Sequence, residues 1–161
     1  MMGRDRTFVL AIGVCLTASV CFASGGKPLP TRPPKTPQAT SQKSAEQVYN
    51  DGLALAGRGD FITAEVRYRE AIKLNPKLPE AWNGLGHALK MQRRFDEAVV
   101  AYNQALELRP DFPLAMEYLG ELYVATGEFD KARDLLSRLQ MVDNRHADEL
   151  ALAIKNGSAG W

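Results

Sequence analysis

The chain has 161 residues, with 20 Lys and Arg, 19 Asp and Glu and a formal net charge of +1, so it lacks the global basic signature of a nucleic-acid-binding protein. Its length fits one folded domain. Both cysteines, Cys15 and Cys21, lie near the start of the chain, so the remainder has no thiol nucleophile, disulfide or cysteine metal ligand.

Residues 1–23 have the layout of a secretory signal peptide. Arg4 and Arg6 form a positive start, an uncharged apolar run follows from Thr7, and Ala23 is a small residue before a candidate cleavage site. Three alternatives stay open: a packed core helix, an uncleaved signal anchor, and lipidation at Cys21, which a bulky preceding residue disfavours. We therefore expect an exported protein, periplasmic or secreted, that contacts the inner membrane only through an uncleaved signal segment or a lipid.

Residues 24–44 contain five prolines and four basic residues but no acidic residue. Such a composition buries too little apolar surface to fold, so we predict a flexible, extended linker. It could hold the folded part off a membrane or simply be solvated. From Ala45 onward the balance reverses, with 14 Lys and Arg against 18 Asp and Glu.

A period of 34 residues aligns three blocks, Ala45–Leu78, Pro79–Phe112 and Pro113–His146. The eighth and twentieth slots hold small residues, and the seventeenth holds an aromatic residue; these are Gly52, Gly86, Gly120, Ala64, Ala98, Ala132, Phe61, Phe95 and Phe129. Small residues let two antiparallel helices approach closely, which offsets the cost of about 1 kcal/mol for a glycine inside a helix. Trp82 fills the apolar seam of the second block, whereas Gly84 lies off the shared pattern and has no assigned role.

These slots closely resemble those of the tetratricopeptide repeat family over residues 45–146. The resemblance implies an all-α fold, a right-handed α-solenoid of three helix pairs, followed in residues 147–161 by a capping helix and a tail. The apolar spacing predicts helices over Ala45–Ala56, Phe61–Leu74, Pro79–Met91, Phe95–Leu108, Pro113–Ala125, Phe129–Met141 and Arg145–Lys155.

In this family the first helices of each pair line a concave groove that binds partners. The polar residues that the resemblance places there are Tyr49, Asn83, His87, Lys90, Glu117 and Glu121; a plain solvated helix face is the alternative. Some family members clamp the carboxylate of heat-shock chaperones with Lys, Asn and Arg. The corresponding positions here hold Tyr49, Leu53, Gly84, Leu114 and Tyr118, so we do not expect that activity.

The chain lacks phosphate-binding, zinc-protease and serine-hydrolase motifs. His87 and Glu121 alone are too few ligands for a metal site, so we predict no metal, no cofactor and no enzymatic activity. The leading hypothesis is a non-enzymatic protein-interaction scaffold that binds a peptide segment or a partner helix, and not nucleic acid. The second is a self-associating assembly factor of an envelope complex, such as a pilus or secretion system.

Overall fold

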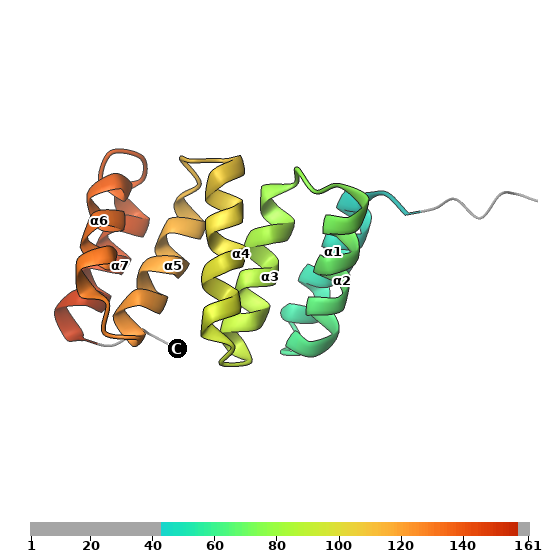
Figure 1. Cartoon of the computed structure of the whole chain (residues 1–161), viewed down its shortest axis with the longest axis horizontal. Helices are drawn as coiled ribbons and strands as arrows, with labels where there is room; N and C mark the ends of the chain where they lie inside the picture. The colour runs from blue at the N-terminus through green and yellow to red at the C-terminus, as the bar shows by residue number, and fades with distance from the viewer. Residues whose placement is uncertain (1–42, 158–161) are drawn as a thin grey trace, which may run out of the picture. The chain divides into compact units, whose positions relative to one another are not determined.

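The computed structural model describes residues 43–157, which form seven α-helices and no strand (Figure 1). The helices are α1 (Ala45–Ala56), α2 (Phe61–Leu74), α3 (Pro79–Met91), α4 (Phe95–Leu108), α5 (Pro113–Ala125), α6 (Phe129–Leu139) and α7 (Asn144–Asn156). The predicted all-α solenoid of helix pairs is confirmed. The predicted signal segment 1–23, the linker up to residue 42 and the tail from residue 158 lie outside the described residues.

Local sequence signals explain where the helices begin. Ser44 forms a capping box with Gln47 at the start of α1, and Asp60 accepts a hydrogen bond of 3.0 Å from the Thr63 amide at the start of α2. Pro79 and Pro113 each occupy the first turn of a first helix, where the missing amide hydrogen costs nothing. The first five helices have the bounds that the sequence predicts.

The last two helices differ from the prediction at their ends. Helix α6 stops at Leu139 rather than Met141, because the next amides form shorter-range bonds, Met141 N to Arg138 O and Val142 N to Leu139 O. Helix α7 begins at Asn144 rather than Arg145, because Asp143 caps it by accepting from two amides, and it ends at Asn156 rather than Lys155.

The three helix pairs share one turn geometry. Gly59, Arg93 and Gly127 occupy the same slot of successive repeats, between the first and second helices, and have φ angles of 80°, 63° and 81°. This left-handed region suits glycine and is costly for other residues. The second repeat therefore makes the same turn with a strained arginine.

Aromatic rings packed on glycines hold neighbouring helices together. The ring of Tyr68 on α2 lies between Gly52 of α1 and Gly84 of α3, and a Cβ added to either glycine would fall within 2.7 Å of that ring. Tyr102 packs in the same way on Gly86. Gly84 therefore does have a role: it admits the tyrosine of the preceding repeat.

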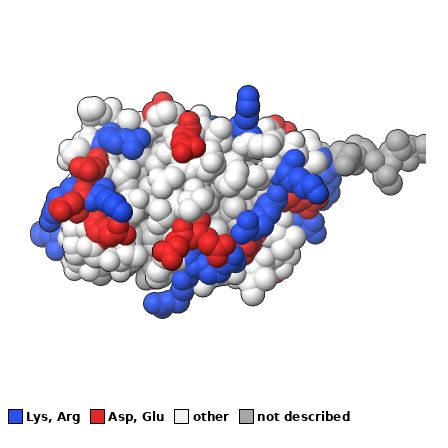
Figure 2. Space-filling view, in the orientation of Figure 1, with Lys and Arg blue, Asp and Glu red and all other residues white. Residues whose placement is uncertain are grey.

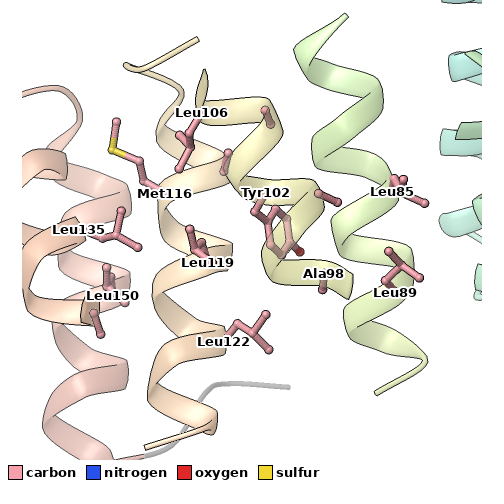
Figure 3. Close-up of a cluster of buried hydrophobic side chains, with 14 of the residues drawn as sticks. Leu85, Leu89, Ala98, Tyr102, Leu106, Met116, Leu119, Leu122, Leu135 and Leu150 are labelled. Carbon is pink, nitrogen blue, oxygen red and sulfur yellow. The ribbon is translucent and has the colours of Figure 1, made fainter. Parts of the chain in front are cut away.

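One continuous apolar core runs from α2 to α7. Figure 3 follows part of it from Leu85 and Leu89 of α3 to Leu150 of α7. Leu150 takes the place of the tyrosine ring at Gly120, where an added Cβ would lie 2.5 Å from its Cδ2. The terminal helix is thus seated on α5 by the same small-residue slot that pairs the earlier helices.

Candidate partner-binding face

The first helices of the repeats follow one another along one side of the helical array. Contacts join α1 to α3, α3 to α5 and α5 to α7, in addition to the contacts within each pair. We call the surface of α1, α3, α5 and α7 the first-helix face. All six candidate residues lie on helices α1, α3 and α5 of this set.

The six candidate residues differ in depth. Tyr49, His87 and Glu121 are half-buried, whereas Asn83, Lys90 and Glu117 are only 6%, 2% and 5% exposed. Partner contact by any of the six stays a prediction. In this structure neighbouring helices cover Asn83, Lys90 and Glu117, so these three side chains face other parts of the protein rather than solvent.

Lys90 and Glu121 form a buried ion pair between α3 and α5. The Lys90 Nζ lies 2.9 Å from Glu121 Oε2 and 4.6 Å from the centre of the Tyr118 ring. Taking two charges out of water is costly unless each charge is well paired. Lys90 and Glu121 can therefore be buried only when α3 and α5 lie side by side in the position that brings the two charges together. The pair positions the middle of the first-helix face.

His87 is part of an aromatic cluster on the same face. Its ring stacks on Tyr118 of α5 at 5.3 Å between centroids, and Phe61 of α2 meets it edge-on at 5.6 Å. Burial, together with the Lys90 charge, lowers the pKa of His87 to about 4. The imidazole is therefore neutral at physiological pH and serves as a flat, uncharged surface.

Tyr118 is the member of this cluster that the repeat pattern does not assign to the polar face. By its slot, Tyr118 is one of the clamp positions whose residue type does not match a carboxylate clamp. An aromatic residue at Tyr118, where the preceding repeat has Gly84, was the available signal. The large ring covers the buried ion pair and supports His87.

Tyr49 lies at the α1 end of the face. Its ring is 5.8 Å from that of Tyr68, and burial and the Glu80 charge raise the pKa of its phenol. The phenol therefore stays protonated and can donate a hydrogen bond. On α3, the Asn83 Oδ1 is buried without a hydrogen-bond partner, which leaves an acceptor unused.

Two protein-family models match the repeats of this helical array. A model for the tetratricopeptide repeat matches residues 79–112, and a second TPR repeat model matches residues 52–93. Residues 52–112 therefore carry tetratricopeptide repeats. The comparison with curated proteins gives no match.

Solved structures share this repeat fold. The TPR2B domain of yeast Sti1, in its pHsp70 complex, is 25% identical, with a TM-score of 0.64 over 70% of this chain and 96% of that chain. The first TPR of Spaghetti (RPAP3), bound to the HSP90 peptide SRMEEVD, is 18% identical, with a TM-score of 0.65 over 70% and 92%. The Yersinia enterocolitica type III secretion translocator chaperone SycD is 18% identical, with a TM-score of 0.63 over 73% and 90%.

A chain of the CopN-Scc3 complex is 24% identical, with a TM-score of 0.61, and the match covers 66% of each chain. This repeat protein therefore spans about two thirds of the length of that relative. Below 25% identity the likeness concerns the fold alone. The fold class is that of protein-interaction modules, and several of these neighbours are solved with a peptide or a protein bound.

Metal-ligand clusters and membrane-spanning helices are both absent from residues 43–157. No group of three or more His, Cys, Asp or Glu there could hold a metal ion, and none of the seven helices is long and apolar enough to span a bilayer. Figure 2 shows basic and acidic side chains interspersed on the face it presents. Charge therefore does not mark a one-sign binding surface on that face.

Exposed apolar side chains lie on both sets of helices. The second helices present Ile62, Val66 and Val100, which are 71%, 57% and 66% exposed. On the first-helix face, Leu53 and Met91 are 45% and 38% exposed. Isolated exposed apolar residues are normal on a protein surface, so neither set marks a binding site by its exposure alone. Because both sets are exposed, they provide matched positions for comparing the two sides of the array.

Proposed function

We propose that this repeat protein is a non-enzymatic scaffold that binds a peptide segment or a partner helix on its first-helix face. The observation that carries the proposal is the packed cluster of His87, Tyr118 and the Lys90–Glu121 pair, which joins two successive first helices. Such a preorganised surface reduces the cost of ordering side chains on binding. The peptide-bound and protein-bound fold neighbours support the same use of the fold.

The chemistry of the face favours an amphipathic partner segment over an acid-tailed one. Leu53 and Met91 are exposed, the His87 ring is neutral, and the one lysine buried among them already pairs with Glu121. The positions that would clamp a terminal carboxylate hold other residue types. A partner with apolar side chains spaced along one face of a helix fits these groups better.

Site-specific photo-crosslinking tests this assignment. A photoreactive phenylalanine analogue would be placed, one at a time, at Leu53 and Met91 on the first-helix face and at Val66 and Val100 on the second helices. We expect the same partner adduct from both first-helix positions and none from the second-helix positions. Because all four side chains are exposed, differences in folding should not determine the outcome.

The crosslinking result can also contradict the proposal. Adducts that form only from Val66 and Val100 would move the binding site to the second helices. A further comparison uses His87→Ala, which removes the stacked ring. We expect that variant to weaken partner capture by at least tenfold while its circular dichroism spectrum stays helical.

We further propose that the protein is exported to the cell envelope, periplasmic or secreted, because residues 1–23 have the order of charged, apolar and small residues of a signal peptide. Cell fractionation with N-terminal sequencing tests this point. A protein recovered outside the cytoplasm and beginning at Ser24 agrees with cleavage. Recovery in the cytoplasm with Met1 intact would contradict export.

Self-association is the second candidate, in which the array acts as an assembly factor of an envelope complex. It would use the end surfaces of the array, since each repeat leaves one face to be covered by a neighbour. Light scattering of the full chain and of a variant lacking residues 145–161 measures it. A strict monomer in both forms would exclude self-assembly and leave the crosslinking result unaffected.

A further inference from the structure

The two junctions between successive repeats differ on the side formed by the second helices α2, α4 and α6. The first junction has a cleft of about 170 Å³ between α2 and α4, and the second has a cleft of about 480 Å³ between α4 and α6. The two clefts are equivalent, because Leu85 lines the first and Leu119, its counterpart one repeat later, lines the second. The second junction is therefore packed less closely on this side than the first.

An ionic network bridges the first junction. Glu65 of α2 pairs with Arg69 on its own helix at 2.9 Å, and it also accepts from the Arg94 guanidinium at 2.7 Å. The Gln92 side-chain amide, in the turn between α3 and α4, donates to the same carboxylate at 2.9 Å. Arg94 and Arg69 then lie 2.6 Å and 3.6 Å from Glu97 of α4. Two carboxylates and two guanidiniums thus close a ring across the cleft, and such networks hold their geometry better than isolated surface pairs.

The second junction cannot form the same network, because the sequence changes at every one of its slots. One repeat later, the counterparts of Glu65, Arg69, Gln92, Arg94 and Glu97 are Val99, Asn103, Thr126, Glu128 and Lys131. Glu128 instead pairs with Lys131 of its own helix, and it accepts from the Thr126 hydroxyl at 3.0 Å. Both contacts stay within the third repeat, so neither of them spans the cleft.

The polar contacts that do cross the second junction lie away from the middle of the cleft. On the first-helix side, the Lys90–Glu121 pair joins α3 to α5 at 2.9 Å. At the loop end, the Arg138 guanidinium of α6 donates to the Pro110 carbonyl at 2.9 Å. A junction that is pinned along one side and at one end, and open on the other side, has a defined pivot.

We propose that the array bends at its second junction and is held at its first by the Glu65 network. Helix α6 would move toward or away from α4 about the Lys90–Glu121 pair, in the manner of a hinge. Close-packed interiors resist deformation, whereas an open cleft of about 480 Å³ can narrow or widen without strain in a packed core. Repeats 1 and 2 then form one block, and repeat 3 with α7 forms another. A partner on the first-helix face would meet one half of fixed shape and one half that adjusts.

Double electron–electron resonance between spin labels on the full chain tests the bend. Ile62, Asp96 and Asp130 share one slot of the three repeats, are exposed, and line neither cleft. In a Cys15→Ser, Cys21→Ser background, labels on Ile62→Cys and Asp96→Cys span the first junction, and labels on Asp96→Cys and Asp130→Cys span the second. We expect the distance distribution across the second junction to be broader by at least about half. Equal widths, or a broader first junction, would overturn the proposal.

Further variants show whether the network is what holds the first junction. Glu65→Ala removes the carboxylate that both arginines share, so the first-junction distribution should broaden toward the width of the second. Glu70→Ala is the matched control on α2, since Glu70 is exposed and pairs within its helix with Arg67 at 2.8 Å; the width should stay unchanged. Val99→Glu with Glu128→Arg places the missing pair at the second junction and should narrow its distribution. An unchanged first-junction width in Glu65→Ala would exclude the proposal, even if the double variant fails to fold.

Discussion

At the residue scale, glycines do more than shorten the distance between paired helices. Tyr68 is 1% exposed and touches Gly52 on one side and Gly84 on the other. The ring cannot retreat from one glycine without meeting the other helix. The Tyr68 ring therefore links two repeats through one glycine from each.

Replacing Gly84 with alanine should destabilise the protein. The new Cβ would lie 2.6 Å from Tyr68 Cε1, and overpacking of this kind costs about 1–3 kcal/mol, which exceeds the gain of up to about 1 kcal/mol in helix propensity. Urea unfolding should show a net loss of about 1–2 kcal/mol. Gly57→Ala is the matched control, since its nearest atom is Leu53 O at 3.4 Å; a Gly84→Ala variant as stable as wild type would refute the packing role.

A substitution at Arg93 should instead stabilise the protein. Its φ of 63° places a non-glycine residue where the other two repeats have glycine, at a cost of about 1–2 kcal/mol. Arg93→Gly should raise the free energy of unfolding by about 1 kcal/mol, as measured by urea or thermal unfolding. Gly59→Ala should lower it by a similar amount, since an added Cβ meets nothing within 4 Å there and only backbone strain is introduced.

The depth of each candidate residue was less predictable than its position along the chain. The 34-residue period places Asn83, Lys90 and Glu117 on the first helices, because helical spacing determines the face of a residue. It does not show that α5 and α7 cover those side chains, because burial depends on contacts between helices far apart in sequence. The ion pair of Lys90 with Glu121 and the contact of Glu117 with His146 are both of that kind.

At the scale of single helices, the sequence signals differ in strength. Helix starts marked by Pro79, Pro113 or an aromatic residue in the seventeenth slot agree with the structure. The turn between α6 and α7 has no proline, and there the prediction missed by one or two residues. Asp143 was the available signal, since a capping aspartate begins a helix at the following residue.

Helix α7 depends on one large apolar contact. Leu150→Ala should lower the free energy of unfolding by about 2–4 kcal/mol, because it removes a fully buried side chain and leaves a cavity beside Gly120. Thermal unfolding monitored by circular dichroism measures the loss. Leu152→Ala, two residues away at a 58% exposed position, should change stability by less than about 0.5 kcal/mol; equal losses in both variants would argue against the observed seat of α7.

At the scale of the whole molecule, two buried ionisable groups make stability depend on pH in opposite directions. Below its unfolded value of about 6.5, the lowered pKa of His87 favours the unfolded state, which binds the proton more readily. The raised pKa of Glu117 favours the folded state at low pH, and that gain is lost as the pH rises to about 8. Between about pH 4.5 and 6.5 the two effects oppose each other.

Urea unfolding across this range should separate the two groups. Wild-type stability should vary little from about pH 4.5 to 6.5 and then fall toward pH 8. With His87→Phe, which keeps a stacked ring, stability should fall across the whole range, by up to about 1.4 kcal/mol per pH unit. With Glu117→Gln it should instead rise to about pH 6.5 and then level off; identical profiles for all three proteins would show that neither group controls the pH response.

Leu150 of α7 fills the slot at Gly120 that a tyrosine of a second helix fills at Gly52 and Gly86, so α7 closes the array through the same kind of contact that recurs within it. A duplicated copy of residues 79–112 inserted before Pro113 would present the same small-residue slots to the helices on both sides. Such an insertion would lengthen the protein by one step and carry α7 outward with it. The chain can thus be treated as a modular spacer whose reach is set by the number of units between α1 and α7.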